Sequence, residues 1–527
     1  MLPDESATAA GRSGWRRPWL PGLVLAVLFF ALGLACLDDY GATWDERETY
    51  LSSLKAAGGA SGEGGARAEG WHVLPGYFFA FDLARGLFAR LFVERLEWLD
   101  WIECQHLFHL VLASLAIFLL YQAAFLLSGR ARLSLWIALA LALFPKFVGH
   151  AQSNPKDLPA LFAFVLVAYA MARLHARKSW GNALFSGAAL GFALSVREHW
   201  RKGLVVTVVA ALVFFACWPW LWPDPIGRLS GALRHFGTLV FDRKVLFLGK
   251  IYRTVSLPWH YTLVSLLIAT PTVFLVAAAL SASSPDPEQR PAFRRIRRLA
   301  WLWIVVLFAL DATATTHYDG FRHLLVVLPG VCMLIGLGLE TLFQLSARWL
   351  GSARSGTLAP AAAVTLAALS CWRLHPYQDS YLNELVNLFV AGRAEEVFEV
   401  EYWGAPYKEG AAWLNAHAEA SAEIYLPEMS QAGFYLEREG KPLDDVEEFA
   451  DLSVPRYFMT ISRRAFYGPT VTRVVRTYEP VFEIRRQESV LLRVYKNDRK
   501  RSPRSGRRLR ARPRFGPAAP ASSNPRT

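Results

Sequence analysis

Ten stretches with few or no charged residues limit what this chain can fold into more than any other feature of its sequence. They are 19–37, 107–128, 133–145, 158–172, 181–196, 203–223, 255–284, 299–310, 324–339 and 357–372. A helix needs about 20 apolar residues to cross the hydrocarbon core of a bilayer, and several stretches reach that length. Two of them, 133–145 and 299–310, are short and need polar flanking residues or shielding by protein. The pattern predicts an all-α polytopic membrane protein with about 9 to 11 transmembrane helices.

The composition excludes an ordinary soluble domain. Of the 527 residues 53% are hydrophobic, and 34 Phe and 19 Trp are among them, which is more than soluble domains carry. The five cysteines show neither metal-ligand spacing nor a disulfide framework. We therefore expect them to be small apolar packing residues.

Most of the net charge of +13 comes from the C-terminal end of the sequence. Residues 499–527 contain ten Lys or Arg and no acid, in a Pro- and Ser-rich context. Such a segment cannot bury a core, so the sequence predicts a disordered basic tail over 498–527. On a membrane protein this tail either touches anionic lipid headgroups or has no specific role, and no nucleic-acid partner is expected.

Basic residues mark the cytoplasmic loops of membrane proteins. Arg12, Arg16 and Arg17 precede the first apolar stretch, which predicts a cytoplasmic N-terminus over 1–17 and a transmembrane domain over 18–373. The long loop 38–105 then lies outside.

The same rule, applied along the chain, places 145–157 and 317–323 outside as well. One conflict remains, because a basic segment separates 181–196 from 203–223. Either 181–196 is re-entrant or a further segment crosses the membrane.

Residues 374–497 differ in kind from the rest of the chain. They are polar and contain short β-rich runs at 422–427, 456–462 and 480–495. The last run reads as two strands with a turn near Gln487 and Glu488, and 408–420 has weak helical spacing. We expect a small extracytoplasmic α/β domain.

The sequence "WDE" follows the first apolar stretch and contributes Asp45 and Glu46. On composition alone this is a solvated acidic loop. The functional alternative is a general base, since a carboxylate held at a membrane boundary can accept a proton from a hydroxyl.

A second motif, "NPKDLP", contains Lys156 and Asp157 at the start of an apolar stretch. Asp157 can be an acid favoured by a helix N-terminus. It can also be a second carboxylate facing the first, with Lys156 offering its charge to a phosphate.

A third motif, "HYDGFRH", places His317, Asp319, Arg322 and His323 at the outer end of an apolar stretch. An arginine there can hold two phosphate oxygens; alternatively, Arg322 snorkels and Asp319 neutralises it. Arg197 is a further candidate for phosphate binding, although its side of the membrane is ambiguous.

Together, these motifs describe one or two carboxylates and several cations at the membrane interface. That combination suits a phosphate leaving group on a lipid carrier and a hydroxyl acceptor that arrives from outside. The catalytic candidates are Asp45, Glu46 and Asp157; the phosphate-binding candidates are Lys156, Arg322 and Arg197; and the supporting residues are His317, Asp319 and His323.

The motifs "WDE", "FPKFVGHAQSNPKDLPALFAF", "LPWHY", "YDGFRHLLVVLPG" and "HPYQDSYLNELV…EYWGAPYKEGAAWL" resemble those of bacterial polytopic glycosyltransferases. These enzymes are related to protein O-mannosyltransferases and lipid A aminoarabinose transferases, of the GT-C type and similar to glycosyltransferase family 39. The resemblance covers residues 44 to about 414. It implies a polyprenyl phosphate-linked sugar donor, inversion at the sugar carbon, and a bacterial plasma membrane protein with an extracytoplasmic site.

The resemblance also implies that Asp45 is catalytic, with Glu46 beside it, and that Asp157 is the second acid. The acceptor is a hydroxyl of a lipid, glycan or protein. Protein mannosylation is not implied, because the extra soluble modules of the mannosyltransferases are missing from the sequence. Some relatives bind a divalent metal, for which His260 and His317 are the candidate ligands.

The alternative function is a transporter or flippase of lipid-linked saccharides. Transporters usually contain paired internal repeats, and none is visible in the sequence. A large outer C-terminal domain is also atypical of them.

Overall fold

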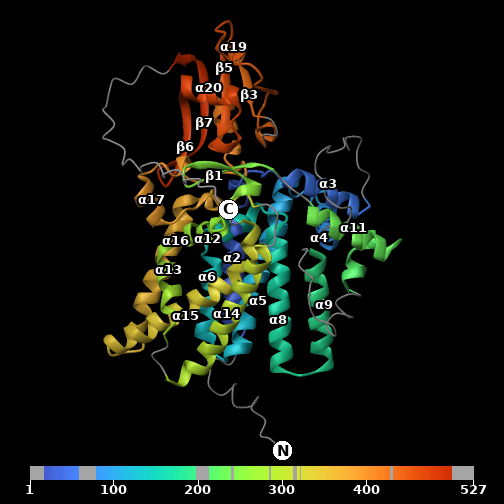
Figure 1. Cartoon of the computed structure of the whole chain (residues 1–527), viewed down its shortest axis with the longest axis vertical. Helices are drawn as coiled ribbons and strands as arrows, with labels where there is room; N and C mark the ends of the chain where they lie inside the picture. Colours follow the sequence, from blue (N-terminus) through green and yellow to red (C-terminus); the bar gives the residue numbers. More distant parts are fainter. Residues whose placement is uncertain are drawn as a thin grey trace, which may run out of the picture.

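The computed structural model describes residues 17–58, 79–196, 213–238, 242–283, 287–312, 317–320, 322–427 and 431–500. Helices dominate it, and a small sheet domain lies at one end of the helical body (Figure 1). The helices are α2 (Leu20–Ala35), α3 (Glu46–Ala56), α4 (Phe79–Ala89), α5 (Trp101–Ser128), α6 (Ala131–Ala142), α7 (Pro145–Ser153), α8 (Asp157–Ala176), α9 (Trp180–Val196), α11 (Pro225–Thr238), α12 (Tyr261–Ala269), α13 (Thr272–Leu280), α14 (Arg290–Asp311), α15 (Leu328–Trp349), α16 (Leu358–Leu374), α17 (Glu384–Val390), α18 (Tyr407–His417), α19 (Val446–Ala450) and α20 (Pro469–Thr477).

Within these residues, four helical segments are long and apolar enough to cross a membrane. They are Trp101–Ser128, Asp157–Ala176, Arg322–Trp349 and Ser355–Leu374. Two bent helix pairs raise the number to six, and α2 is a shorter apolar helix. The predicted number of 9 to 11 spans is thus not confirmed. Residues 203–212 of the stretch 203–223 lie outside the described residues.

Two predicted apolar stretches are bent. The stretch 133–145 continues from α6 into α7 with a bend of 63°, and 255–284 divides into α12 and α13, which meet at 105°. The second bend follows Pro271, and Pro145 opens α7; proline interrupts helices because it lacks an N–H and clashes with the preceding turn. Neither stretch is one straight span.

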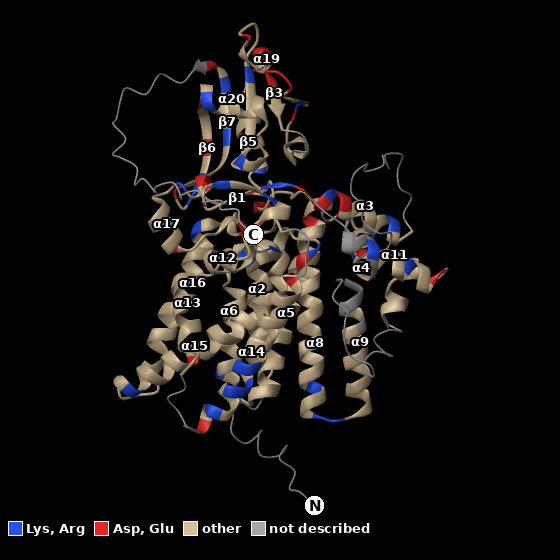
Figure 2. Cartoon of the chain, in the orientation of Figure 1, with Lys and Arg blue, Asp and Glu red and all other residues tan. Residues whose placement is uncertain are grey.

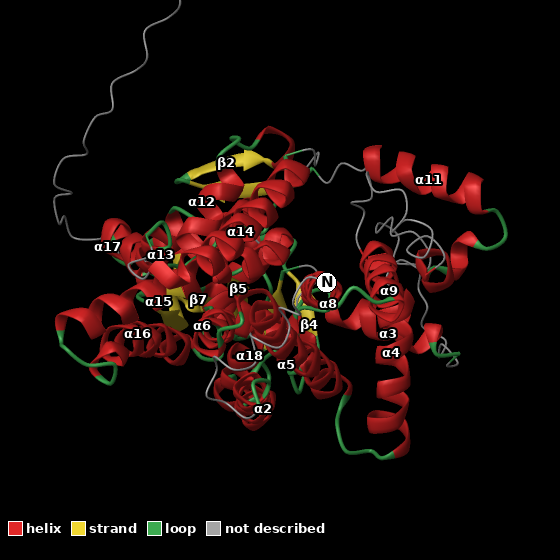
Figure 3. Ribbon diagram, turned by 90° about the horizontal axis from the view of Figure 1, so that it is seen from below, coloured by secondary structure: helices red, strands yellow, loops and turns green. Residues whose placement is uncertain are grey.

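The helices pack around a core in which α5 contacts α2, α6, α7, α8 and α14. The pair α8 and α9 lies side by side, with α9 at the edge of the body (Figures 1 and 3). On the other side, α15 packs against α6 and α13. A Cβ at Gly338 of α15 would collide with the backbone carbonyl of Ala277 in α13. The close approach of α15 and α13 therefore requires that position 338 has no side chain.

The C-terminal sheet has five strands in the order β4-β3-β5-β7-β6. β3 pairs in parallel with β4 and β5, whereas β7 is antiparallel to β5 and β6. The strands are β3 (Glu423–Leu426), β4 (Gly440–Pro442), β5 (Arg456–Ile461), β6 (Tyr478–Arg486) and β7 (Ser489–Lys500).

All four predicted strands are confirmed, as is the turn, where Gln487 and Glu488 both adopt positive φ. α18 occupies the predicted helix. The tail prediction was wrong at its start, because β7 continues to Lys500 and pairs there with Tyr478. Residues 501–527 of the predicted tail lie outside the described residues.

The C-terminal region does not build its core alone. A hairpin of β1 (Lys244–Phe247) and β2 (Lys250–Arg253) precedes α12. Its residues Val245 and Phe247 share a hydrophobic cluster with Tyr377, Leu414 and residues of β3, β5 and β7. β1 lies between the helical body and the sheet (Figure 1), so this hairpin joins the two.

Charged residues lie at both ends of the helical body (Figure 2). Basic residues of α14 gather at the end away from the sheet, and acidic residues of α3 lie at the end beside it (Figure 2).

Candidate active site

The first loop is held beneath the C-terminal region. The indole Nε1 of Trp44 donates to the carbonyl of Tyr402 at 2.7 Å, and the Trp44 amide donates to the carbonyl of Trp403 at 3.2 Å. The next residue, Asp45, occupies the N-cap position of α3 without capping it. Its side chain therefore remains available to other partners.

Asp45 lies between two cations. Its Oδ1 is 3.0 Å from Lys156 Nζ, and its Oδ2 is 3.7 Å from Arg322 Nη1. Burial raises the pKa of this carboxyl, but the positive charges of Lys156 and Arg322 together lower it by more. The pKa of Asp45 therefore lies below its ordinary value. Oδ2 has no hydrogen-bond donor among the described residues. Asp45 is thus a buried, ionised carboxylate, one oxygen of which accepts no hydrogen bond from the described residues.

Glu46 does not join this group. Its Oε2 accepts hydrogen bonds from the Thr43 amide at 2.6 Å and the Thr43 hydroxyl at 3.1 Å, and its Oε1 is 3.0 Å from His106 Nε2. The side chain is fully buried. In the described residues its partners belong to the loop and to α5, so Glu46 shapes the loop that carries Asp45.

The "NPKD" motif forms the N-terminus of α8. Asn154 Oδ1 accepts from the amides of Lys156 and Asp157 at 3.1 and 2.8 Å, and Asn154 Nδ2 donates to Asp157 Oδ2 at 3.1 Å. Asn154 therefore fixes both residues of the motif. Lys156 points to Asp45, and Asp157 points to Arg322, whose Nε is 3.8 Å away.

Arg322 is the centre of the cluster. It opens the 3₁₀ turn Arg322–Val327 that leads into α15, and it is close to three carboxylates, those of Asp319 at 3.2 Å, Asp45 at 3.7 Å and Asp157 at 3.8 Å. Its guanidinium lies over the Trp403 ring, 4.5 Å from the centroid. Three acids from separate chain segments thus converge on one buried guanidinium.

The C-terminal domain supplies a residue that the sequence prediction missed. Arg463, just after β5, forms an ion pair with Asp319 and lies 3.8 Å from Glu399. Burial raises the pKa of Glu399, and Arg463 opposes this shift. The only sequence signal was the pair of arginines at 463–464 after an apolar strand, which reads as a solvated turn.

The remaining predicted residues divide. His323 Nδ1 is 4.0 Å from Asp157, so His323 lies at the cluster. His317 pairs instead with Asp311 at the end of α14, at 3.0 Å, and this hydrogen bond raises the pKa of His317. Its predicted supporting role at the acids was wrong. Arg197 lies outside the described residues.

A second buried polar cluster adjoins the site and was not predicted. Lys146 of α7 donates to the carbonyl of Asp379 and lies 5.5 Å from the centroid of the Tyr402 ring. The Glu401 carboxylate accepts from the amides of Trp403 and Gly404, both at 2.7 Å. Glu401 therefore fixes the backbone that positions the Trp403 ring over Arg322.

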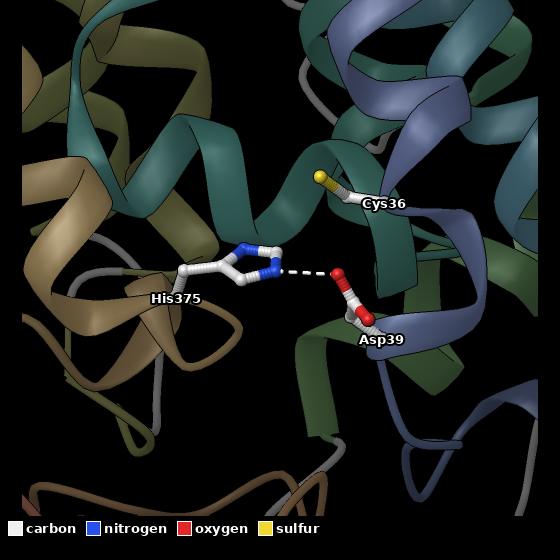
Figure 4. Close-up of side chains that lie close together, drawn as sticks. All are labelled: Cys36, Asp39 and His375. Carbon is white, nitrogen blue, oxygen red and sulfur yellow. Dashed lines mark hydrogen bonds and ion pairs between the residues drawn. The ribbon is translucent and has the colours of Figure 1, made fainter.

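One group of the described residues has the ligand types of a metal site. Cys36, Asp39 and His375 bring their ligand atoms within 4.8 Å of one another (Figure 4). His375 Nε2 is 2.7 Å from Asp39 Oδ2, and its Nδ1 faces the Gln378 amide nitrogen at 3.3 Å.

The Gln378 Oε1 accepts from the Tyr40 hydroxyl at 2.9 Å, which fixes the orientation of this amide. Nδ1 of His375 then accepts a hydrogen bond, and Nε2 carries the proton toward Asp39. A metal would need the lone pair of Nε2, so the arrangement fits a His–Asp hydrogen bond better than a metal centre. The predicted candidate ligands His260 and His317 do not form such a group within the described residues.

Comparison with known families matches residues 105–248 to the family described as dolichyl-phosphate-mannose-protein mannosyltransferase. This segment includes Lys156 and Asp157, and the match confirms the resemblance predicted from the motifs. Comparison with curated protein sequences gives no match.

Comparison with solved structures also gives matches. ArnT from Cupriavidus metallidurans bound to undecaprenyl phosphate is 14% identical, with 90% of this chain and 97% of that chain covered and a TM-score of 0.44. The arabinofuranosyltransferase AftD from Mycobacteria is 11% identical, with 89% of this chain and 39% of that chain covered and a TM-score of 0.39.

Proposed function

We propose that this protein transfers a sugar from a polyprenyl phosphate donor to a hydroxyl acceptor on the outer face of the membrane, with Asp45 as the general base. Lys156 and Arg322 bind the donor phosphate. Asp157 and Asp319 orient Arg322, and His323 supports Asp157. The family match, whose name refers to a sugar on a lipid phosphate, supports the donor class.

One observation carries the proposal. Asp45 lies 3.0 Å from Lys156 and 3.7 Å from Arg322, and these are the two cations to which we expect the donor phosphate to bind. Both are cations that bind phosphate, Arg322 through paired donors and Lys156 as a point charge. A phosphate bound to them would bring its sugar carbon close to Asp45 Oδ2, which accepts no hydrogen bond from the described residues. The base and the leaving group would then be held by the same residues.

In this reaction the acceptor oxygen bonds to the anomeric carbon as the bond from that carbon to the phosphate oxygen breaks. The acceptor proton moves to Asp45, and the bonding electrons leave with the phosphate. Inversion follows because the acceptor attacks opposite the leaving group. Arg322 and Lys156 stabilise the negative charge that grows on the departing phosphate.

Donor binding would also activate the base. In the free protein Lys156 and Arg322 keep the pKa of Asp45 below its ordinary value, which makes it a weak proton acceptor. A bound phosphate draws these cations away and adds negative charge nearby, and both effects raise the pKa of a carboxyl. Asp45 would therefore become a competent base only in the donor complex.

The decisive experiment compares the masses of envelope lipids, glycans and glycoproteins from cells with the wild-type gene, without it, and with Asp45→Asn. A transferase predicts a product with one added sugar that is missing from both mutant strains. The purified protein should also release carrier phosphate from the donor. Movement of an intact lipid-linked sugar across vesicles without its consumption would support the flippase alternative and overturn the proposal.

A further inference from the structure

A large apolar groove, none of whose lining residues belongs to the acidic cluster, lies between α8, α9 and α14. Its volume is about 1100 Å³, and its walls include Phe164, Met171, Leu190, Trp303 and Val306. Small-molecule sites usually have volumes of about 300–1,000 Å³ and a few placed polar groups. This groove has room for a larger and more apolar ligand.

The groove is charged at one end only. Arg294, Arg295 and Arg298 of α14 line it together with His175 from the last turn of α8. The Arg residues of α14 gather at the end of the helical body away from the sheet (Figure 2). The remainder of the lining is almost wholly apolar. Such a groove matches an amphiphile with an anionic head and hydrocarbon chains.

The arginines differ in how they are engaged. Arg295 donates to the carbonyl of Leu127 at 2.9 Å, whereas Arg294 and Arg298 are exposed and form no ion pair within the described residues. These two are one helical turn apart, so their side chains lie on the same face of α14. Two neighbouring guanidinium groups can bind a phosphate through parallel hydrogen bonds.

A basic helix end alone would only report which side of the membrane it faces. Here the arginines open onto a groove whose walls are apolar along α8 and α14, where Phe164 and Trp303 meet edge to face at 6.2 Å. Basic pockets between transmembrane helices on the cytoplasmic side bind the head groups of anionic lipids.

We propose that this groove is a binding site for an anionic phospholipid of the membrane. Arg294 and Arg298 hold the phosphate, and the acyl chains lie along α8 and α14. This site is separate from the proposed catalytic cluster and does not depend on it.

The test titrates the full-length protein, purified in a neutral detergent, with dioleoyl phosphatidylglycerol or dioleoyl phosphatidylcholine, and counts the bound lipid by native mass spectrometry. The wild-type protein should prefer phosphatidylglycerol. Arg294→Gln with Arg298→Gln should weaken this preference by roughly tenfold or more, since each basic residue near an anionic lipid surface contributes on the order of a fivefold effect.

The matched control is Arg348→Gln with Arg354→Gln, which removes two exposed basic residues outside the groove. It should leave the preference unchanged. Ala168→Trp, which fills the groove without a change of charge, should lower the binding of both lipids. An excess of inorganic phosphate should not compete, because it has no acyl chains.

Three results would overturn the proposal. The first is equal loss of preference in the Arg348/Arg354 control, which would mean a non-specific charge effect. The second is competition by inorganic phosphate, which would mean a simple anion site. The third is stoichiometric displacement of phosphatidylglycerol by undecaprenyl phosphate at much lower concentration, which would assign the groove to the carrier lipid.

Discussion

Arg463 of the C-terminal domain pairs with Asp319, the same carboxylate that lies 3.2 Å from Arg322. Asp319 therefore links the sheet domain to the guanidinium at the centre of the acidic cluster. Because Arg463 neutralises part of the negative charge of Asp319, it weakens the electrostatic attraction between Asp319 and Arg322. The sheet domain is in this way part of the electrostatic environment of the site.

Arg463→Gln should raise the KM for the donor more than it lowers kcat, because Asp319 would then hold Arg322 more tightly and away from the phosphate. It should also destabilise the fold by about 3–5 kcal/mol, since Asp319 and Glu399 lose a buried partner. In Arg463→Lys, which keeps the positive charge, the KM for the donor should lie close to the wild-type value.

Steady-state kinetics and thermal unfolding measure both effects. The control is Arg464→Gln, which removes the neighbouring arginine and its surface pair with Glu396 at 3.1 Å. A positioning role for Arg463 would be wrong if its loss changed stability but left the KM unaltered.

Asp45→Asn should lower turnover by about 10²-fold or more, the usual scale for a positioned general base. The amide keeps the shape of the side chain but cannot accept the proton. Turnover is measured under donor saturation in protein whose yield and melting temperature match the wild type. Glu48→Gln is the matched control, as it removes a charge from the same helix near Lys156. Wild-type turnover in Asp45→Asn would remove Asp45 from the mechanism.

Arg322→Lys should impair donor binding, because the lysine keeps one charge but loses the paired donors. Arg322→Ala is less informative, since it strands three carboxylates near one buried position and should unfold the site. The measurement is the apparent KM for the donor in folded Arg322→Lys, with Arg348→Lys at the far end of α15 as the control. Normal kinetics with reduced thermal stability would show that Arg322 is only a structural ion-pair partner.

Asp379→Asn should change how stability depends on pH. Burial and the neighbouring Glu401 raise the pKa of Asp379 above its ordinary value of 3.8. The stability from its protonated form is therefore fully present below pH 3.8 and is lost as the pH rises through the raised pKa. Melting temperatures from acidic to alkaline pH should fall less steeply in Asp379→Asn than in the wild type. Glu439 is exposed, so Glu439→Gln should follow the wild-type curve. If the melting temperature of Asp379→Asn fell with pH as steeply as that of the wild type, the raised pKa of Asp379 would be disproved.

Gly149→Ala should destabilise the protein by about 1–3 kcal/mol or more, as overpacking does. A Cβ at this position of α7 would collide with the backbone of Asp379. Since α7 leads into Asn154, which fixes Lys156 and Asp157, activity should fall with stability. Gly433→Ala, whose new Cβ would meet no atom within 4 Å, is the control for thermal unfolding and turnover.

The sequence was sufficient to bring Asp45, Lys156, Asp157 and Arg322 together, because the alternation of basic loops placed their motifs on one face. The sequence could not show which of the two acids, Asp45 or Glu46, faces this cluster. Both acids follow Trp44, and only the fold shows that Glu46 meets Thr43 and His106.

Other features depend on distant pairing. Arg463 lies 144 residues from Asp319, and no local pattern relates them. His317 was placed with the wrong acids, although Asp311 lies six residues before it. The bends at Pro145 and Pro271 did have a local signal, because each proline interrupts an apolar stretch.

The contact between Trp44 and Tyr402 joins residues 358 positions apart in the chain, and it determines when the site is completed during synthesis. The loop with Asp45 leaves the ribosome early, long before Tyr402 and Trp403, to which it is hydrogen-bonded, have been synthesised. A nascent chain that has not yet reached Trp403 lacks the indole ring over Arg322, and one that has not yet reached Arg463 lacks the counter-ion of Asp319. The cluster around Arg322 is therefore complete only after the last part of translation, and a prematurely terminated product would lack these contacts.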